Sequence, residues 1–369
     1  MIQTVSLSDI CTKITSGGTP LTKRDDYYGG GIPWLRTQEV NFGNIYSTEK
    51  TITELGLKNS SAKIIPEDSV IVAMYGATAG RSAINKIPLA TNQACCNLII
   101  DNNKADYRFV YYYLVNSYEK LLSAAVGAAQ QNLGSKQISA MTINLPPLYQ
   151  QKKIADILSS LDEKIELNRR MNETLEQLGQ TLFRHYFVDK AKQSNGNIQT
   201  IPLGKKFHPK RGRSLQARDM ICGDTPVISG GLKPAGFHNE ANTTAPVITI
   251  SASGANAGFV SVWGEPVWSA DSSYIDSTIT KYVYTYYLFL KNKQKEIYDM
   301  QTGSGQPHIY PKHIELLEIV DLSDCEFDDF EQMVRPLFDM IHENKKQIDY
   351  LSKIRDLLLP KLISGEIKI

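Results

Sequence analysis

The sequence Ile165-Glu166-Leu167-Asn168-Arg169-Arg170 returns 176 positions later as Ile341-His342-Glu343-Asn344-Lys345-Lys346. Apolar positions on both sides recur at this offset without a gap, as do three positions further upstream. The recurring positions are Ile154, Ile157, Leu158, Leu161, Leu175, Leu178 and Leu182 against Phe330, Met333, Val334, Leu337, Leu351, Ile354 and Leu358, and Gln130, Lys136 and Ile138 against Gln306, Lys312 and Ile314. A long repeat present twice predicts two half-proteins of one plan, each a globular part followed by a helix.

Around the repeated stretches the apolar spacing is that of paired helices. Every seventh position is apolar except for one asparagine in each copy, which is the a-position series of a coiled coil. The series are positions 154, 161, 168, 175 and 182 and positions 330, 337, 344, 351 and 358. We predict an antiparallel two-helix coiled coil that pairs through Leu161, Leu175, Leu337 and Leu351. A buried asparagine needs a polar partner, so we expect Asn168 to meet Asn344; the alternative is that each faces solvent at the edge of the seam.

A proline interrupts the second helical segment. Pro336 stands where the first copy has Ser160. Proline removes an amide donor and disfavours helix at the preceding residue. We therefore expect a break or kink near residues 160 and 336, with a short helix before each long one.

The segments that precede the helices share short apolar runs and turns. Ser69-Val70-Ile71-Val72-Ala73-Met74 and Pro246-Val247-Ile248-Thr249-Ile250 have the composition of strands, and Gly76-Ala77-Thr78-Ala79-Gly80 is echoed by Gly254-Ala255-Asn256-Ala257-Gly258. We predict the α+β class, with two globular mixed α/β domains in pseudo-twofold arrangement, separated by the coiled coil. The expected boundaries are 1–147 for the first globular domain, 148–188 for a central helical region, 189–324 for the second globular domain and 325–369 for a C-terminal helical region.

Composition excludes some classes of protein. The 369 residues carry a formal net charge of +1, so overall basicity does not point to nucleic acid. The sequence has no visible secretory signal and no apolar stretch of membrane-spanning length. Its five cysteines are odd in number and lack C-x-x-C spacing, which favours free thiols over a zinc site or disulfides. We expect a cytoplasmic location and no membrane partner.

Known catalytic and metal-binding motifs are missing from the sequence. Positions 76–82 lack the spacing and the lysine of a phosphate loop, and the six histidines form no H-x-H or H-E-x-x-H pair. We therefore expect no catalytic, cofactor or metal site in this chain.

What remains are side chains that can contact phosphates and base edges. Taken singly, each is better explained as a loop residue, whereas two positionally related sets favour DNA recognition. The candidate DNA-binding residues are Lys23, Arg24, Arg36, Thr37, Arg81, Gln130, Asn132, Lys136, Lys210, Arg211, Arg213, Asn256, Gln306, His308 and Lys312.

Three stretches resemble one protein family. Leu145-Pro146-Pro147-Leu148-Tyr149-Gln150-Gln151-Lys152-Lys153-Ile154 and the following residues 158–170 resemble the central conserved region of type I restriction–modification specificity subunits. The ending Leu357-Leu358-Leu359-Pro360-Lys361-Leu362-Ile363-Ser364-Gly365-Glu366-Ile367 is similar to the C-terminal ending of that family, and Gly29-Gly30-Gly31-Ile32-Pro33-Trp34 to a turn near the start of its recognition domains. One departure is Gln150, where the family usually has glutamate.

The resemblance implies a DNA specificity subunit without a catalytic site of its own. Each of two target recognition domains would recognise one half of an asymmetric, bipartite site in double-stranded DNA. The helices would set the gap between the halves and dock two methyltransferase (M) subunits, which bind S-adenosylmethionine and methylate adenine. Restriction (R) subunits that use ATP and magnesium would join for cleavage. These cofactors are expected in the partner subunits and none in this chain.

Two other functions stay open at this point. A self-contained DNA adenine methyltransferase would need a cofactor loop, and Asn144-Leu145-Pro146-Pro147 departs from the Asn/Asp-Pro-Pro-aromatic motif of such enzymes. A structural adaptor with a coiled-coil hairpin and two protein-binding domains would not bind DNA. Pairing of the helices between two chains is a further alternative, although the gapless offset favours pairing within one chain.

Overall fold

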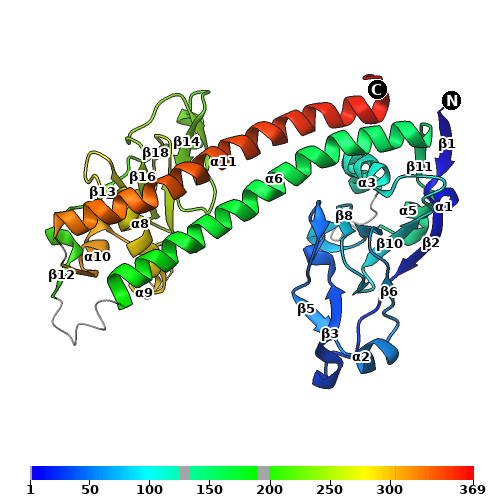
Figure 1. Ribbon diagram of the computed structural model, residues 1–369, viewed down its shortest axis with the longest axis horizontal. Coiled ribbons are helices and arrows are strands. Elements are labelled where there is room, and N and C mark those ends of the chain that lie inside the picture. Colours follow the sequence, from blue (N-terminus) through cyan, green and yellow to red (C-terminus); the bar gives the residue numbers. More distant parts are fainter. Residues whose placement is uncertain (1, 125–132, 190–198, 304, 322) are drawn as a thin grey trace. The chain divides into compact units, whose positions relative to one another are not determined.

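The computed structural model describes residues 2–124, 133–189, 199–303, 305–321 and 323–369 (Figure 1). The chain forms two compact units. The first unit comprises Met1–Glu166 and Asp349–Ile369, and the second comprises Leu167–Ile348. Each unit combines strands and short helices with a part of α6 (Leu148–Phe183) and a part of α11 (Asp324–Ser364).

The described residues of the first unit form three sheets. β1 (Gln3–Ser6) pairs antiparallel with β11 (Thr142–Leu145), which ties the start of the chain to the entry of α6. The other two sheets have the orders β2–β10–β7–β8–β4 and β5–β3–β9–β6. Their strands are β2 (Cys11–Ser16), β3 (Tyr28–Leu35), β4 (Asn44–Ile45), β5 (Lys50–Ile52), β6 (Ile64–Ile65), β7 (Val70–Ala73), β8 (Ser82–Asn85), β9 (Leu89–Thr91) and β10 (Cys95–Ile100).

Helix α3 joins the five-stranded sheet of the first unit to the long helices. Its Phe109 and Leu114 are fully buried in one cluster with Val72 of β7, Leu158 of α6 and Leu362 of α11. Burial of such side chains is the main stabilising contribution to the unit. The helices of this unit are α1 (Leu7–Ile10), α2 (Glu54–Lys58), α3 (Tyr107–Asn116), α4 (Tyr118–Ala124) and α5 (Ser135–Ala140), with 3-10 turns η1 (Asp25–Tyr27), η2 (Thr37–Glu39) and η3 (Gly76–Thr78).

The second unit repeats this plan. β12 (Thr200–Pro202) pairs with β20 (Glu318–Val320), and two further sheets have the orders β13–β19–β16–β17 and β15–β14–β18. Their strands are β13 (Lys210–Arg211), β14 (Thr225–Ile228), β15 (Gly236–His238), β16 (Val247–Ser251), β17 (Val260–Trp263), β18 (Trp268–Ser269) and β19 (Ser272–Asp276). The helices are α8 (Val283–Asn292), α9 (Gln294–Asp299) and α10 (Pro311–Glu315), with η5 (Leu203–Lys205), η6 (Ala217–Asp219) and a π-helical turn η4 (Arg184–Asp189) that continues α6.

Equivalent elements keep the offset seen in the sequence. Helices α3 and α8 both have 10 residues and begin at Tyr107 and Val283, 176 positions apart. The same offset separates the first residues of α6 and α11. Gly76 and Gly254, which open equivalent turns, have φ angles of 80° and 82°, a region that glycine enters without steric cost. The predicted duplication of a mixed α/β plan is therefore confirmed within each unit.

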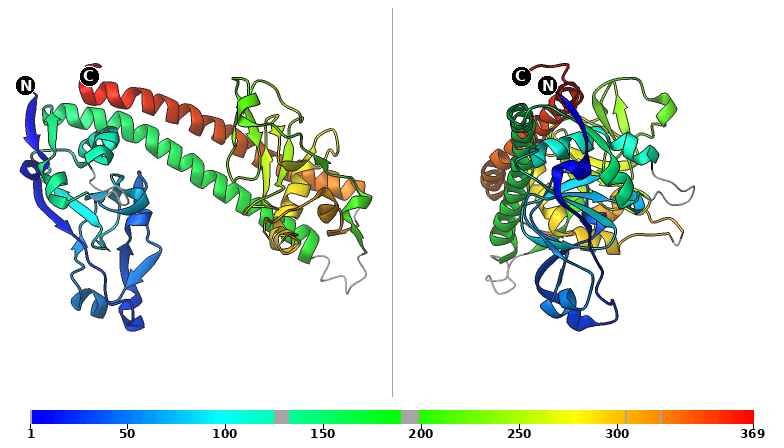
Figure 2. Two further views of the ribbon diagram at one scale, coloured as in Figure 1. Left: turned by 180° about the vertical axis from the view of Figure 1, so that it is seen from behind. Right: turned by 90° about the vertical axis from the view of Figure 1, so that its right-hand side faces the viewer.

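The two long helices lie side by side and antiparallel in both units (Figures 1 and 2). In the first unit Asp162 of α6 contacts Arg355 of α11, and in the second unit Asn172 contacts Asn344. Residue numbers thus fall along α11 as they rise along α6. The predicted antiparallel pairing is confirmed.

The predicted break near residues 160 and 336 is wrong. Helix α6 runs without interruption over 36 residues and α11 over 41 residues, through Pro336. The loss of one amide donor at Pro336, which is exposed, is offset by the burial of Phe330, Val334 and Phe338 on the opposite side of the same helix.

The predicted meeting of Asn168 with Asn344 is also wrong in register. Both are buried, which excludes the solvent-facing alternative. However, the side-chain amide of Asn168 donates to Gln347 Oε1 at 3.1 Å, and that of Asn344 donates to Asn172 Oδ1 at 2.9 Å. The helices are therefore shifted by about one turn from the alignment that would join the two asparagines. Leu161, Leu175, Leu337 and Leu351, which were expected to pair the helices, are half-buried.

Candidate nucleic-acid interface

The basic turn before β3 is exposed in the first unit. Lys23 and Arg24 both face solvent. Arg24 forms a bidentate ion pair with Asp26, with nitrogen–oxygen distances of 2.8 and 2.7 Å, and its guanidinium lies 4.9 Å from the centre of the Tyr27 ring. The hydrogen-bonded Asp26 carboxylate raises the pKa of Arg24 further above its usual range. Arg24 is thus held in one orientation, whereas Lys23 projects from the turn.

Arg36 borders a groove beside the basic turn. The groove is lined by Thr22, Asp25, Tyr28, Gly29, Trp34, Arg36, Glu49, Lys50 and Thr51. The Arg36 guanidinium pairs with Glu49 and lies 3.6 Å from Glu39 Oε1. A ligand phosphate or base would have to compete with these carboxylates. Lys50, which is exposed in the same groove, was not among the sequence candidates, because a single lysine in a short strand gives no motif.

The remaining first-unit candidates have different surroundings. Thr37 is buried, and its hydroxyl exchanges hydrogen bonds with Asn92, so it holds the loop together. Arg81 contacts Asn41 and lies over the Phe42 ring.

Three further candidates follow in the chain. Lys136 on α5 is exposed. Gln130 and Asn132 lie outside the described residues. Leu133, which comes directly after them, donates its amide to Met74 O at 2.9 Å, at the end of β7.

The second unit presents a basic edge strand. Lys210 and Arg211 form β13, at one edge of its sheet, and are exposed, as is Arg213 directly after the strand. Arg211 donates to Asp271 Oδ1 at 2.6 Å, and the other oxygen of Asp271 accepts from the Ser253 hydroxyl. Asp271 therefore connects the basic strand to the turn after β16.

The candidates Asn256, Gln306 and His308 gather at that same turn. Gly254 donates its amide to Pro307 O at 3.1 Å, and Ser253 forms a β-bridge with His308. The structure thus brings Arg211, Asn256, Gln306 and His308 together from three separate segments. Lys312 is exposed on α10, a few residues further along. No signal in the sequence identifies Asp271 as the link, since it comes from a fourth segment.

Clusters of metal-ligating side chains and cysteine thiols are the other groups of chemical interest. Among the described residues, no group of three or more His, Cys, Asp or Glu could hold a metal ion. Burial raises the pKa of both Cys95 and Cys96 to about 12, so neither thiol is a ready nucleophile. No described helix is long and apolar enough to cross a bilayer.

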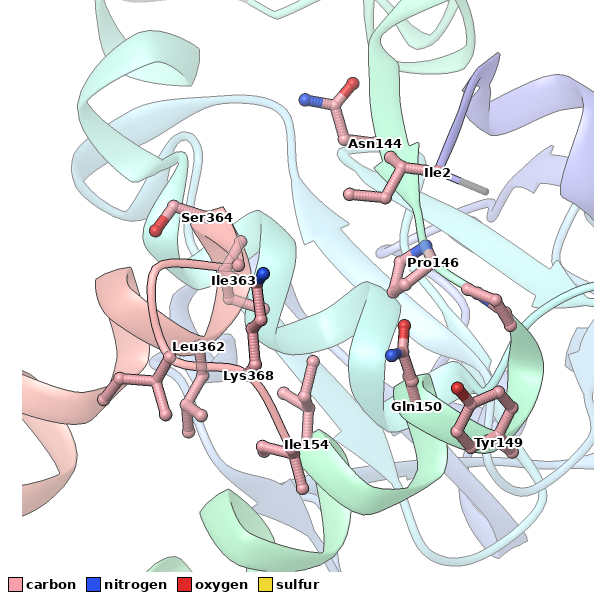
Figure 3. A pocket seen from close by; sticks show the side chains of 14 residues that line it. Ile2, Asn144, Pro146, Tyr149, Gln150, Ile154, Leu362, Ile363, Ser364 and Lys368 are labelled. Atoms are coloured by element: carbon pink, nitrogen blue, oxygen red, sulfur yellow. The ribbon is translucent and has the colours of Figure 1, made fainter.

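A pocket lies where the two ends of the chain meet in the first unit (Figure 3). Ile2 lies on one side, Tyr149 and Gln150 at the start of α6, and Leu362 and Lys368 at the end of the chain. The full lining is Ile2, Asn144, Pro146, Pro147, Tyr149, Gln150, Ile154, Leu362, Ile363, Ser364, Gly365, Ile367, Lys368 and Ile369. Lys368 is the single charged side chain among them.

Comparisons with known proteins agree on one family. Residues 2–177 match the family model described as the type I restriction modification DNA specificity domain. The chain is 28% identical to the type I restriction enzyme MjaIX specificity subunit of Methanocaldococcus jannaschii, over 97% of this chain and 91% of that protein. It is 25% identical to the HindI specificity subunit of Haemophilus influenzae, over 70% of this chain and 77% of that protein.

A solved structure has the same fold. The crystal structure of the type I restriction-modification system S subunit from M. genitalium covers 98% of this chain and 96% of its own length, with a TM-score of 0.66 and 21% sequence identity. The resemblance of the helical motifs to type I restriction–modification specificity subunits is thereby confirmed: residues 2–177 match the DNA specificity domain of that family, and the relatives named above are specificity subunits.

Proposed function

We propose that each globular part of this chain recognises one half of an asymmetric, bipartite DNA target for a type I restriction–modification complex. The observation that carries the proposal is one backbone plan used twice with different surfaces. The first unit offers Arg36 and Lys50 in a groove and an exposed Lys23 next to the lining residue Thr22, whereas the second offers an exposed basic strand and the turn at Asn256. Two related scaffolds with unlike polar side chains suit two unlike half-sites.

The proposed division of labour follows the segments 1–147, 148–188, 189–324 and 325–369. The globular segments would contact DNA, and the helical segments would set the spacing between half-sites and dock two methyltransferase subunits. Exposed apolar side chains support the docking role. Ile157 on α6 is 36% exposed, and Met333, its counterpart 176 positions later on α11, is 39% exposed. Two equivalent apolar positions suit two copies of one partner.

In this proposal the chain carries no catalytic group. The methyltransferase partners would bind S-adenosylmethionine and methylate adenine, and restriction subunits would supply the ATP- and magnesium-dependent steps, all in the cytoplasm. Neither a self-contained methyltransferase nor a DNA-independent adaptor agrees with the names of the relatives, which are specificity subunits.

The decisive experiment is methylome sequencing of cells that express this chain with its methyltransferase partner. We expect one asymmetric motif in two parts with a fixed gap. Replacing residues 189–324 by the corresponding segment of another specificity subunit should change one part of the motif and leave the other part and the gap unchanged. A palindromic motif, or a change in both parts, would contradict the proposal.

Single substitutions test the residues in vitro with the assembled methyltransferase complex. Arg36→Ala should weaken binding to the cognate duplex by about 1–3 kcal/mol if it contacts a base, and relax only one half-site. A combined Lys210→Ala and Arg213→Ala change should lower the salt dependence of binding without relaxing specificity if these side chains contact phosphates. Lys58→Ala and Lys295→Ala, exposed and outside the candidate surfaces, serve as controls.

A further inference from the structure

The contacts that join α6 to α11 differ between the two units, although the positions that make them are equivalent. Tyr112, Asp162 and Arg355 meet in the first unit. The repeat places Leu288, Phe338 and Gly179 at the corresponding positions of the second unit. The pairs Asp162–Arg355 and Phe338–Gly179 each join one long helix to the other, and the offset of 176 residues relates the positions of one pair to those of the other.

The first-unit contact is a polar triad. The Tyr112 hydroxyl donates to one oxygen of the Asp162 carboxylate at 2.8 Å, and the Arg355 guanidinium donates to the other at 2.8 Å. Tyr112 is 4% exposed, while the side chains of Asp162 and Arg355 are 21% and 29% exposed. Both carboxylate oxygens are thus occupied, one by the globular part and one by the opposite helix.

The second-unit contact is an apolar triad in which the opposite helix contributes no side chain. Phe338 and Leu288 are fully buried. A methyl group added at Gly179 would lie 3.3 Å from Leu288 Cδ2 and 3.8 Å from Phe338 Cε2. A methyl group at position 179 would thus fit with a small shift of the Leu288 side chain, whereas a long side chain would press against both Leu288 and Phe338.

The hydrogen bonds of the central seam show the same dependence on partner. Asn168 donates to Gln347, whose counterpart on α6 is Met171. Asn344 donates to Asn172, whose counterpart on α11 is Ile348. If either helix paired with a copy of itself, the asparagine would face an apolar residue in place of an amide.

A fifth contact also depends on the unlike helix. The Tyr287 hydroxyl on α8 donates to Glu176 Oε1 on α6 at 2.6 Å. The α11 counterpart of Glu176 is Ser352, whose shorter side chain carries no charge. All five polar or shape-matched contacts thus need one helix of each kind.

We propose that these contacts are a pairing code, by which each half of this chain accepts the other half and rejects a second copy of itself. The first half is residues 1–189, and the second half is residues 199–369. The partner recognised by each long helix is therefore the unlike helix with its attached globular part.

The two like pairings fail for different physical reasons. If two first halves paired, Asp162 would face Gly179 in place of Arg355, and a partly buried carboxylate would lose its cation. If two second halves paired, Arg355 would enter the space that now fits glycine, and its charge would be pressed against Phe338 and Leu288. Given the proposed function, this code ensures that one chain yields an asymmetric target and not a palindromic one.

One pair of substitutions reproduces both mismatches inside the intact chain. Gly179→Arg combined with Arg355→Ala gives the first unit an unpaired Asp162 and gives the second unit an arginine against Phe338. We expect its unfolding temperature to fall by several degrees below that of the wild-type chain. Lys353→Ala, which removes an exposed basic side chain from α11, and Gly179→Ala, which adds only a methyl group, are the matched controls.

Rescue variants distinguish a specific pairing preference from a general loss of stability. Adding Leu288→Tyr and Phe338→Asp to Gly179→Arg rebuilds the polar triad in the second unit and should raise the unfolding temperature above that of Gly179→Arg alone. Adding Tyr112→Leu and Asp162→Phe to Arg355→Ala should do the same in the first unit. Failure of both rescues, or wild-type stability of the mismatched chain, overturns the proposal. Arg355→Ala leaves space and creates no clash. If Gly179→Arg does not fold, the comparison of Arg355→Ala with and without Tyr112→Leu and Asp162→Phe therefore tests the proposal.

Partner choice is measured directly after cutting the folded full-length chain at a protease sequence inserted within residues 190–198. The cut protein is unfolded in urea, refolded and weighed by native mass spectrometry. The wild-type halves should return as unlike pairs in large excess, whereas the chain with Tyr112→Leu, Asp162→Phe and Arg355→Ala should form more like pairs. As many like pairs as unlike pairs from the wild-type chain would contradict the code, whatever the stability data show.

Discussion

Helices α3 and α8 occupy equivalent places in the two units, yet different carboxylates satisfy their first turns. In α3 the cap is local, because Asp106 accepts hydrogen bonds from the amides of Arg108 and Phe109 at 2.9 and 3.4 Å. In α8 the position equivalent to Asp106 is Tyr282, which cannot cap in this way. The acceptor comes instead from Glu331 on α11.

The remote cap in the second unit is made by a buried carboxylate. Glu331 is 4% exposed and accepts from both the amide and the hydroxyl of Thr285, at 2.9 and 2.8 Å. Its counterpart in the first unit is Ala155. Duplication has thus kept the requirement for an acceptor at the helix start, which follows from backbone geometry, while the side chain that meets it has moved to another helix.

This difference extends to the way each unit holds its helices. The first unit adds to its apolar cluster polar contacts such as Asp162–Arg355, which are partly exposed. The second unit relies on buried aromatic rings, of which Tyr284 and Phe338 stack with their centres 4.7 Å apart. The second unit should therefore respond most to changes of volume and to burial of charge, and the first unit to salt.

The largest expected effect comes from opening a cavity in the second unit. Phe338→Ala removes a fully buried ring that contacts Tyr284 and Tyr287, and should lower the free energy of unfolding by about 3–5 kcal/mol. Leu337→Ala, at a half-buried neighbouring position, is the control and should cost clearly less. Equal losses for the two variants, measured by urea unfolding, would refute the aromatic account of this unit.

Much of this architecture follows from residue spacing alone. The offset of 176 and the seven-residue spacing predicted two copies and two long antiparallel helices, since both depend on local chain geometry. The spacing did not predict that α11 continues through Pro336. The local cost of the proline is offset by side chains that are buried on the opposite side of the helix. The spacing did not predict the register of Asn168 either. It shows which face of the helix is buried, but it does not show that Gln347 is the partner of Asn168.

The candidate interface was harder to predict than the fold. Basic side chains are visible in a sequence, but the carboxylates that hold them are not. Arg36 pairs with Glu49, and Arg211 with Asp271, across 13 and 60 positions. Whether a basic residue is free to contact a ligand therefore depends on long-range packing, as does the gathering of Asn256 with His308.

A second prediction concerns a buried histidine of the second unit. His342 is 9% exposed, and burial, together with Lys345 and Lys346, lowers its pKa from 6.5 to about 4. The unfolded chain therefore binds a proton before the folded chain does, and stability is lost as pH falls from 6.5 towards 4. The loss should reach about 3 kcal/mol at most, at 1.36 kcal/mol per pH unit.

The control for the histidine is a side chain that does not titrate. His342→Phe should flatten the dependence of unfolding free energy on pH across this window. A wild-type chain and a His342→Phe variant that lose stability in parallel between pH 6.5 and about 4 would show that other groups are responsible.

A third prediction compares the two caps. Glu331→Ala leaves the amides at the start of α8 without an acceptor in a buried site and should cost about 1–3 kcal/mol. Asp106→Ala in the first unit should cost about 1 kcal/mol, the usual value for a local cap. Glu331→Gln keeps an acceptor oxygen and should recover most of the loss. If Asp106→Ala proves the more damaging variant in urea unfolding, the remote cap is the less important of the two.

The smallest expected effect is the dependence of the first unit on salt. Asp162→Asn keeps the shape of the side chain and removes its charge, so about 1 kcal/mol should be lost at low ionic strength, because the pair with Arg355 is partly exposed. At 1 M salt the Debye length falls to about 3 Å and the difference between the two proteins should shrink. Phe338→Ala should show no such convergence, since its loss is one of packing. A gap between Asp162→Asn and wild type that stays constant with salt would mean that the Tyr112 hydrogen bond, and not the ion pair, is what this position contributes.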